Sequence, residues 1–137
     1  MLIEFEKSLE TGNDLIDTQH RELIARVNKL TTDCTIGKEK NVAVQTLGFL
    51  MEYTEFHFAA EEKLQEDNRY PEITAHKGQH VQFVKAVDEL YEMLQEEEGP
   101  SEAFVEAVKK NVVEWLLNHI KVWDKRVAEF VKSNSEM

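Results

Sequence analysis

The sequence predicts an all-α protein, an antiparallel up-down-up-down four-helix bundle with an N-terminal arm. Strand signals are nearly absent, since no stretch shows sustained alternation or the Asn-Gly and Asp-Gly turns of β-hairpins. Apolar residues instead recur three or four positions apart, which is the period of a helix with one buried face. The helix-breaking residues Gly12, Gly37, Pro71 and the pair Gly99-Pro100 divide the 137 residues into a leader and four long segments. Short connections between such segments make neighbouring helices antiparallel.

The first two helices are expected over residues 17–35 and 40–67, after an arm of residues 1–12 that crosses one end of the bundle. Asp17 is placed to cap the N-terminus of the first helix. The inner face of the first helix carries Leu23, Ile24, Val27 and Leu30, and that of the second carries Val44, Leu47, Leu50, Met51 and Leu64.

The third and fourth helices are expected over residues 71–96 and 101–132, which completes a single domain of residues 1–137. Pro71 suits the first turn of the third helix, and Ser101 followed by Glu102 opens the fourth. The inner faces carry Ile73, Phe83, Val84, Val87, Leu90 and Leu94 in the third helix and Val105, Val108, Val112, Leu116, Val127 and Phe130 in the fourth.

Composition excludes several classes of protein. The chain carries 16 Lys and Arg against 27 Asp and Glu, a formal net charge of −11. This charge is repelled by nucleic-acid phosphates and anionic membranes, so neither nucleic-acid binding nor membrane insertion is expected. The 42% of hydrophobic residues is enough to close a core. A single cysteine, Cys34, and the lack of a secretory signal at residues 1–7 favour a cytoplasmic protein.

All five histidines fall on the predicted inner faces, at His20, His57, His76, His80 and His119. A neutral imidazole in an apolar core needs a partner for at least one nitrogen, and an unpaired one costs about 1–3 kcal/mol. Hydrogen bonds to neighbours usually satisfy a lone buried histidine. Five of them, drawn from all four helices, indicate a shared metal centre instead.

Two pairs of candidate ligands follow the helical period. His57 and Glu61 are four residues apart in the second predicted helix, and His76 and His80 are four apart in the third. Side chains at this spacing lie one turn apart on one face and can meet at a common ion. A buried carboxylate takes up a proton unless a cation pairs with it, so Glu61 calls for a cation. Glu62 is the competing candidate, but its offset of five from His57 turns it toward the flank, and Glu61 is preferred.

Asp124 is the second carboxylate candidate, five residues after His119 in the fourth predicted helix. Five residues turn an ideal helix by about 140°, so the two side chains should not share a face. Either Asp124 reaches back, or the helix contains a local wide turn of the π type, which is frequent at functional sites. In the competing interpretation, Asp124 forms a surface ion pair of little value with Lys121, Lys125 or Arg126.

Five imidazoles and two carboxylates are too many donors for one tetrahedral zinc ion. They suit two octahedral ions that share the carboxylates and leave room for an exogenous ligand. A set rich in imidazole and without thiolate favours iron, with manganese, zinc or cobalt as alternatives. The Glu-x-x-His motif of oxygen-activating di-iron bundles does not occur in the sequence.

Four motifs, one in each predicted helix, resemble those of the hemerythrin family, in particular the single-domain bacterial hemerythrins. They are residues 16–23 (IDTQHREL), 57–62 (HFAAEE), 70–71 with 76–80 (YP and HKGQH), and 115–120 with 124–125 (WLLNHI and DK). The motifs stand in the order of the family and span nearly the whole chain. Together they are highly specific, and the resemblance assigns Asp124 to the site.

The resemblance implies a non-haem centre of two iron ions with a bridging oxo or hydroxo group. In the family pattern, His76, His80 and His119 hold one iron, His20 and His57 hold the other, and Glu61 and Asp124 bridge both. The iron with two histidines keeps an open position, where dioxygen binds. By the same resemblance, the walls of the dioxygen pocket are Leu23, Phe58, Trp115, Leu116 and Ile120.

The function that the resemblance implies is reversible dioxygen binding for carriage, storage or delivery, without enzymatic activity and with an unidentified protein as acceptor of the gas. The alternatives are an oxygen or redox sensor and a di-iron enzyme acting on peroxide, nitric oxide or ferrous iron. Sensory family members are usually fused to output domains, and an enzyme would need an electron donor or proton relay, for which no second cofactor motif is evident. A purely structural bundle does not account for five inward-facing histidines. No large exposed apolar stripe is evident, so a monomer is expected.

Overall fold

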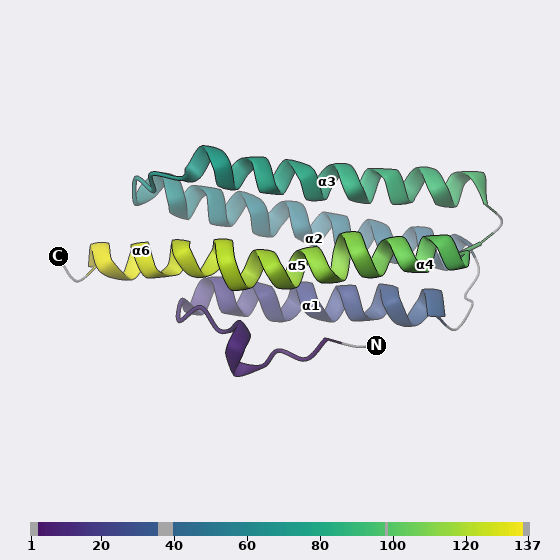
Figure 1. Cartoon of the computed structure of the whole chain (residues 1–137), viewed down its shortest axis with the longest axis horizontal. Helices are drawn as coiled ribbons and strands as arrows, with labels where there is room; N and C mark the ends of the chain where they lie inside the picture. The colour runs from purple at the N-terminus through teal and green to yellow at the C-terminus, as the bar shows by residue number, and fades with distance from the viewer. Residues whose placement is uncertain (1–2, 36–39, 98, 136–137) are drawn as a thin grey trace.

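The computed structural model describes residues 3–35, 40–97 and 99–135 of the chain, which form a bundle of long helices (Figure 1). The arm contains a 3-10 turn, η1 (Lys7–Leu9), and leads into α1 (Asp14–Thr35), α2 (Lys40–Asp67) and α3 (Ile73–Glu96). The fourth helix is continuous and contains two π-helical segments. It consists of α4 (Glu102–Val108), the π-helical η2 (Lys109–Glu114), α5 (Trp115–Asn118), the π-helical η3 (His119–Asp124) and α6 (Lys125–Ser135).

The helices pack in the order of the chain. α1 lies against α2, α2 against α3, and the fourth helix closes the bundle between α3 and α1 (Figure 1). The predicted all-α four-helix bundle is therefore confirmed. None of the described helices is both long enough and apolar enough to cross a membrane.

The arm runs alongside α1 instead of crossing an end of the bundle (Figure 1). Ile3 pairs with Asn28 of α1 in both directions, because the Ile3 N–H donates to Asn28 Oδ1 at 2.8 Å and the Asn28 amide donates back to the Ile3 carbonyl at 2.8 Å. Leu9 is buried in the core. These contacts hold the arm over the groove between α1 and the fourth helix, where Leu9, Val113 and Leu117 line one depression.

Asp17 does not cap α1 as predicted, since α1 begins three residues earlier. Asn13 takes the capping role, and its Oδ1 accepts a hydrogen bond from the Ile16 N–H at 3.0 Å. The Asp17 carboxylate instead accepts from the N–H and hydroxyl of Thr11, at 2.9 and 2.7 Å, and from the Gly12 N–H at 3.2 Å. Gly12 has a φ of +89°, which a residue without Cβ adopts at little cost. Asp17 thus fastens the arm at the turn into α1.

The other helix starts also reflect local chemistry. Pro71 is not in the first turn of the third helix, as predicted, but lies two residues before α3, in the turn that follows Arg69, which has a positive φ of 56°. Ser101 caps the fourth helix as predicted, because its side-chain oxygen accepts from the Phe104 N–H at 3.1 Å. Such a cap contributes about 1 kcal/mol.

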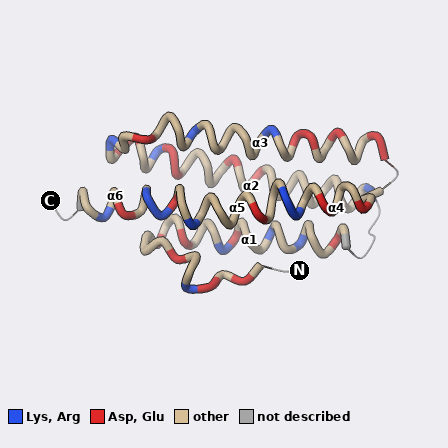
Figure 2. Tube along the Cα trace, in the orientation of Figure 1, with Lys and Arg blue, Asp and Glu red and all other residues tan. Residues whose placement is uncertain are grey.

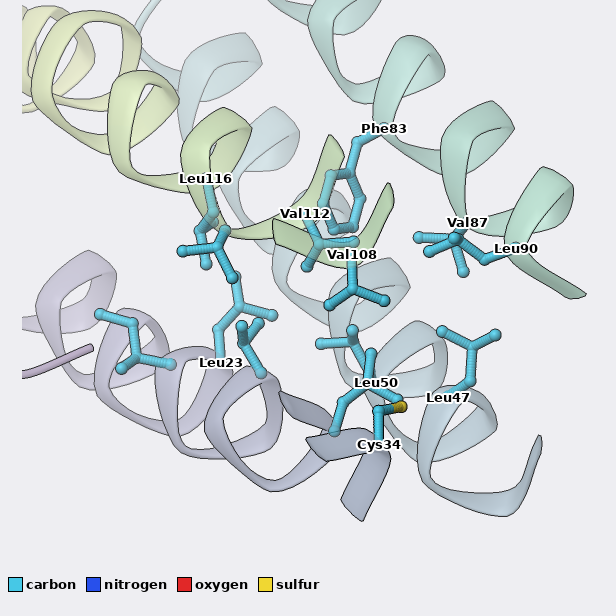
Figure 3. Packing of buried hydrophobic residues seen from close by; sticks show 14 of the residues in the cluster. Leu23, Cys34, Leu47, Leu50, Phe83, Val87, Leu90, Val108, Val112 and Leu116 are labelled. Atoms are coloured by element: carbon cyan, nitrogen blue, oxygen red, sulfur yellow. The ribbon is translucent and has the colours of Figure 1, made fainter. Parts of the chain in front are cut away.

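The main apolar core draws side chains from all the helices of the bundle, and Figure 3 shows part of it from close by. Its members include Leu23 of α1, Leu47 and Leu50 of α2, Phe83, Val87 and Leu90 of α3, and Val108, Val112 and Leu116 of the fourth helix. Burying each such side chain stabilises the fold by about 1.5–3 kcal/mol. Cys34 is packed in the same core, where burial raises the pKa of its thiol to about 11.

A second, smaller apolar cluster closes the other end of the bundle, with Ile16, Tyr70, Val127 and Ala128 at its centre. In each helix, the inward-facing histidines come between a residue of this cluster and a residue of the main core. A band of buried polar side chains therefore crosses the bundle between two apolar layers.

Acidic residues occur along the whole length of the bundle and on the arm (Figure 2).

Candidate metal centre

All seven predicted ligands lie in this polar band, and none is more than 3% exposed. They come from every helix of the bundle: His20 from α1, His57 and Glu61 from α2, His76 and His80 from α3, and His119 and Asp124 from η3. The structure thus brings together residues that the sequence separates by up to about a hundred positions.

The donor atoms fall into two groups that share two residues. The larger group contains Glu61, His76, His80, His119 and Asp124, and the smaller contains His20, His57, Glu61 and Asp124. Within each group, one donor atom of every residue lies within 4.8 Å of the others. Five protein donors face one position and four face the other, with both carboxylates common to the two.

Glu61 presents a different oxygen to each group. Its Oε1 lies 2.8 Å from His76 Nε2 and 3.1 Å from His80 Nε2. Its Oε2 lies 3.9 Å from His57 Nε2, on the side of the smaller group. A carboxylate arranged in this way can bridge two ions.

Asp124 shows the same division. Its Oδ1 lies 3.1 Å from both His76 Nε2 and His119 Nε2, whereas its Oδ2 lies 2.8 Å from His20 Nε2. It is fully buried, so the alternative of a surface ion pair with nearby lysines is wrong. Asp124 is therefore the second candidate bridge.

The π-helical winding of η3 explains how Asp124 reaches the site. A π-turn closes between residues i and i+5, so a residue five positions later stands over the first. His119 and Asp124 are the first and last residues of η3, and the Lys125 N–H that follows donates to the Ile120 carbonyl, five residues back. Of the two predicted ways to bring Asp124 to the site, the local wide turn is the one observed.

The donor atoms of the centre lie close to one another. Contacts between histidine Nε2 atoms and carboxylate oxygens range from 2.8 to 3.9 Å, and His76 Nε2 lies 3.0 Å from His119 Nε2. These spacings bring the donors within reach of shared ions.

Unsatisfied polar atoms also indicate cations at the centre. Glu61 Oε2 and both carboxylate oxygens of Asp124 accept no aligned hydrogen bond from any residue that the structure describes, and their nearest partners are imidazole nitrogens at 2.8 to 3.9 Å. A bound cation would satisfy these oxygens, since a buried charged group without hydrogen bonds costs more than about 1–3 kcal/mol. The residues present therefore fit a pair of metal ions.

Two outer hydrogen bonds orient ligand imidazoles. Gln19 Oε1 accepts from His57 Nδ1 at 2.7 Å, and Glu62 Oε2 accepts from His80 Nδ1 at 2.8 Å. Both contacts place the proton on Nδ1 and leave the Nε2 lone pair free to face the centre. The sequence did not predict these roles. It correctly placed Glu62 toward the flank of its helix, but the spacing within one helix does not show that His80 of another helix lies there.

The buried charges are balanced by protons on histidine. Burial alone lowers the pKa of His76, but interactions with the Asp124 and Glu61 carboxylates outweigh it and raise the pKa to about 9. The pKa of His20 is also raised, because its interaction with the Asp124 carboxylate outweighs the lowering effect of burial. Burial dominates at His57 and lowers its pKa to about 4.

The two carboxylates stay ionised. Burial raises the pKa of Asp124, yet the neighbouring His119 and the other histidines hold it well below its usual range. Burial and the Asp124 charge raise the pKa of Glu61, but its contacts with His76 and His80 outweigh both and lower it. Both carboxylates therefore present negative charge to the histidines around them.

Aromatic rings flank the larger group. The Phe58 ring stacks on His80 with centroids 3.7 Å apart and an interplanar angle of 4°, and the half-buried Trp115 stacks on His119 at 4.5 Å and 11°. The other residues predicted for the pocket, Leu23, Leu116 and Ile120, are each no more than 1% exposed. Leu23 and Leu116 extend into the space between α1 and α5 (Figure 3).

Comparison with known proteins places this arrangement in a family. Residues 11–131 match the sequence profile of the family described as Hemerythrin HHE cation binding domain. The chain belongs to the hemerythrin family. This hemerythrin domain therefore contains a buried cluster of histidines with Glu61 and Asp124 that could hold metal ions.

Relatives of this hemerythrin domain include the bacteriohemerythrin of Stenotrophomonas maltophilia, which is 33% identical over 133 residues, covering 97% of this chain and 84% of the relative. The bacteriohemerythrin of Aquifex aeolicus is 33% identical over 129 residues, covering 94% and 97%. Among solved structures, wild-type hemerythrin superimposes with a TM-score of 0.84 at 25% identity, covering 96% of this chain and 98% of the other. The resemblance of the four motifs to this family is therefore confirmed.

Proposed function

We propose that this hemerythrin-family protein binds dioxygen reversibly at a centre of two iron ions, as a carrier, store or delivery protein and not as an enzyme. The observation that carries the proposal is the unequal donor set, with five protein donors facing one position, four facing the other and two carboxylates shared. The smaller group, with His20 and His57, leaves space for one more exogenous ligand than the larger group. A small molecule entering the centre would bind on that side.

The donor chemistry supports iron. Imidazole nitrogens and carboxylate oxygens without thiolate suit iron, and seven donors are too many for one tetrahedral zinc ion. His76, His80 and His119 would hold one ion, His20 and His57 the other, and Glu61 and Asp124 both. A pair of ferrous ions supplies the electrons that dioxygen needs in order to bind.

The surrounding side chains favour binding without further chemistry. Reduction of bound oxygen beyond the first step consumes protons, which a dioxygen carrier must withhold. Leu23, Leu116 and Ile120 are at most 1% exposed and carry no ionisable group, and Phe58 is 5% exposed. These four residues would exclude water from the centre.

Stopped-flow optical spectroscopy tests the proposal. The iron-loaded, anaerobically reduced protein is mixed with dioxygen, and the spectrum is followed before and after the gas is removed under vacuum. A long-lived oxygenated spectrum that returns to that of the reduced protein is the expected result. Rapid conversion to the oxidised protein, without recovery, would instead favour an enzyme.

A further inference from the structure

The Nδ1 atoms of the candidate ligand histidines differ in their hydrogen-bond acceptors. His57 Nδ1 donates to the neutral amide oxygen of Gln19, whereas His80 Nδ1 donates to the carboxylate of Glu62. The Nδ1 atoms of His20, His76 and His119 make no hydrogen bond within the described part of the chain. His80 is thus the ligand whose outer nitrogen faces an anion.

Glu62 lies where the centre approaches the surface. Its side chain is 28% exposed, while that of His80 is 3% exposed. Both line a groove of about 570 Å³ between α2 and α3, together with Phe58, Val81 and Val84. The Glu62–His80 contact therefore links a buried ligand to a residue at the edge of solvent.

The ring of His80 is held from two directions. Phe58 stacks on its face, which sets the plane of the ring, and Glu62 accepts from its edge, which sets the rotation within that plane. With the Nδ1 proton committed to Glu62, Nε2 faces Glu61 Oε1 at 3.1 Å. Neither contact makes Glu62 a ligand of the centre.

A carboxylate acceptor does more than orient an imidazole. It draws the Nδ1 proton toward itself, which makes Nε2 a stronger donor, and a stronger donor favours an ion of higher charge. A neutral amide such as that of Gln19 orients the ring with a much smaller electronic effect.

We propose that Glu62 is a positioning residue that acts through His80, fixing its tautomer and strengthening its donation, so that the position with three histidines preferentially stabilises the more oxidised metal. This inference rests on the metal centre of the proposed function. It predicts an electronic inequality between the two positions beyond their different numbers of ligands.

Three variants separate orientation from charge. Glu62→Gln keeps an acceptor for His80 but removes the negative charge, whereas Glu62→Leu removes both. Glu55→Gln is the matched control, because Glu55 is an exposed glutamate of the same helix that lines the same groove and contacts no ligand of the centre. Circular dichroism of each apoprotein establishes that it folds.

The first measurement is zinc affinity in competition with a chelator, and the second is the reduction potential of the iron-loaded protein. Glu62→Leu is expected to lose about 10–100-fold in zinc affinity, and Glu62→Gln less. For Glu62→Gln, the potential should rise, and a tenfold selective loss of ferric over ferrous affinity corresponds to about 59 mV per electron. A merely structural role would weaken both oxidation states equally and leave the potential unchanged.

A potential and zinc affinity in both Glu62 variants equal to those of Glu55→Gln would overturn the inference. A Glu62→Gln potential equal to wild type, with only Glu62→Leu impaired, would reduce Glu62 to orientation and overturn the electronic part. Failure of the wild-type protein to take up zinc or iron would overturn the metal centre itself, and this inference with it. Normal metal uptake without dioxygen binding would leave the role of Glu62 intact and contradict the proposed function alone.

Discussion

Loading the apoprotein with metal should release protons, because the pKa values of two candidate ligands, His76 and His20, are raised. A ligating imidazole must be neutral at the ligating nitrogen, so every protonated ligand histidine loses a proton when metal binds. The pKa of His76 is raised to about 9, and that of His20 is raised as well. His57, with a pKa lowered to about 4, is already neutral at pH 7 and contributes none.

The size of the effect follows from these directions. At pH 7, removing the proton from His76 costs about 3 kcal/mol, since the pKa lies two units higher and each unit is about 1.4 kcal/mol. Glu61 and Asp124 are ionised already, because their pKa values are lowered. Metal binding at pH 7 should therefore release between about one and two protons, and the apparent affinity should rise about tenfold per pH unit for each proton released.

Isothermal titration calorimetry measures this release. Zinc is titrated into the apoprotein at pH 7 in buffers of different ionisation enthalpy, and the dependence of the observed heat on the buffer gives the number of protons. The same titration above pH 9 should show the release falling toward zero as His76 loses its proton in the apoprotein. Binding at pH 7 without proton release, or an affinity that does not change between pH 6 and 8, would contradict the raised pKa values of His76 and His20.

Three further predictions concern stability and the pocket. In urea unfolding, the apoprotein should be most stable near neutral pH. The stabilisation from the raised pKa of His76 is complete below about pH 6.5 and is lost as the pH rises through 9, and that from the lowered pKa of His57 is complete above about pH 6.5 and is lost as the pH falls through 4. An unfolding midpoint that does not change with pH would contradict both shifts. Gly78→Ala should raise the free energy of unfolding by up to about 1 kcal/mol, because Gly78 is exposed inside α3 and an added Cβ meets nothing within 4 Å; a lower melting temperature would show a hidden constraint. Leu116→Ala should lower the free energy of unfolding by about 2–5 kcal/mol and also shorten the lifetime of the oxygenated protein. The control Leu90→Ala, elsewhere in the core, should lower the free energy of unfolding by as much without changing that lifetime. Equal lifetimes in the two variants would show that Leu116 is not part of the pocket.

The helices and their inner faces could be predicted from the sequence because both depend on local spacing. An apolar period of three to four residues determines which side of a helix is buried, and the histidines share that period. The spacing of the apolar residues alone therefore places His20 and His119 toward the interior. The structure brings both into the polar band.

Features that depend on contacts between helices could not be predicted in the same way. The winding of η3 brings Asp124 into line with His119, and spacing in an ideal helix argued against that alignment. The outer partners Gln19 and Glu62 meet histidines 38 and 18 residues away, on other helices. No one-dimensional period encodes such pairs.

The predicted start of α1 was wrong for a different reason. Asp17 and Asn13 are both good capping residues, and the choice between them depends on where the arm turns. Once Thr11 and Gly12 hydrogen-bond to Asp17, its carboxylate is occupied and Asn13 caps the helix. Local propensity offers two equivalent solutions, and the docking of the arm selects one.

The proposed dinuclear site, in which Glu61 and Asp124 would both contact two ions, is tested most directly by a crystal structure of protein purified from iron-replete cells, with anomalous differences collected at the iron absorption edge. We expect two peaks per chain, both in contact with the two carboxylates, one surrounded by His76, His80 and His119 and the other by His20 and His57. A single peak, or none among these side chains, would contradict a dinuclear iron centre.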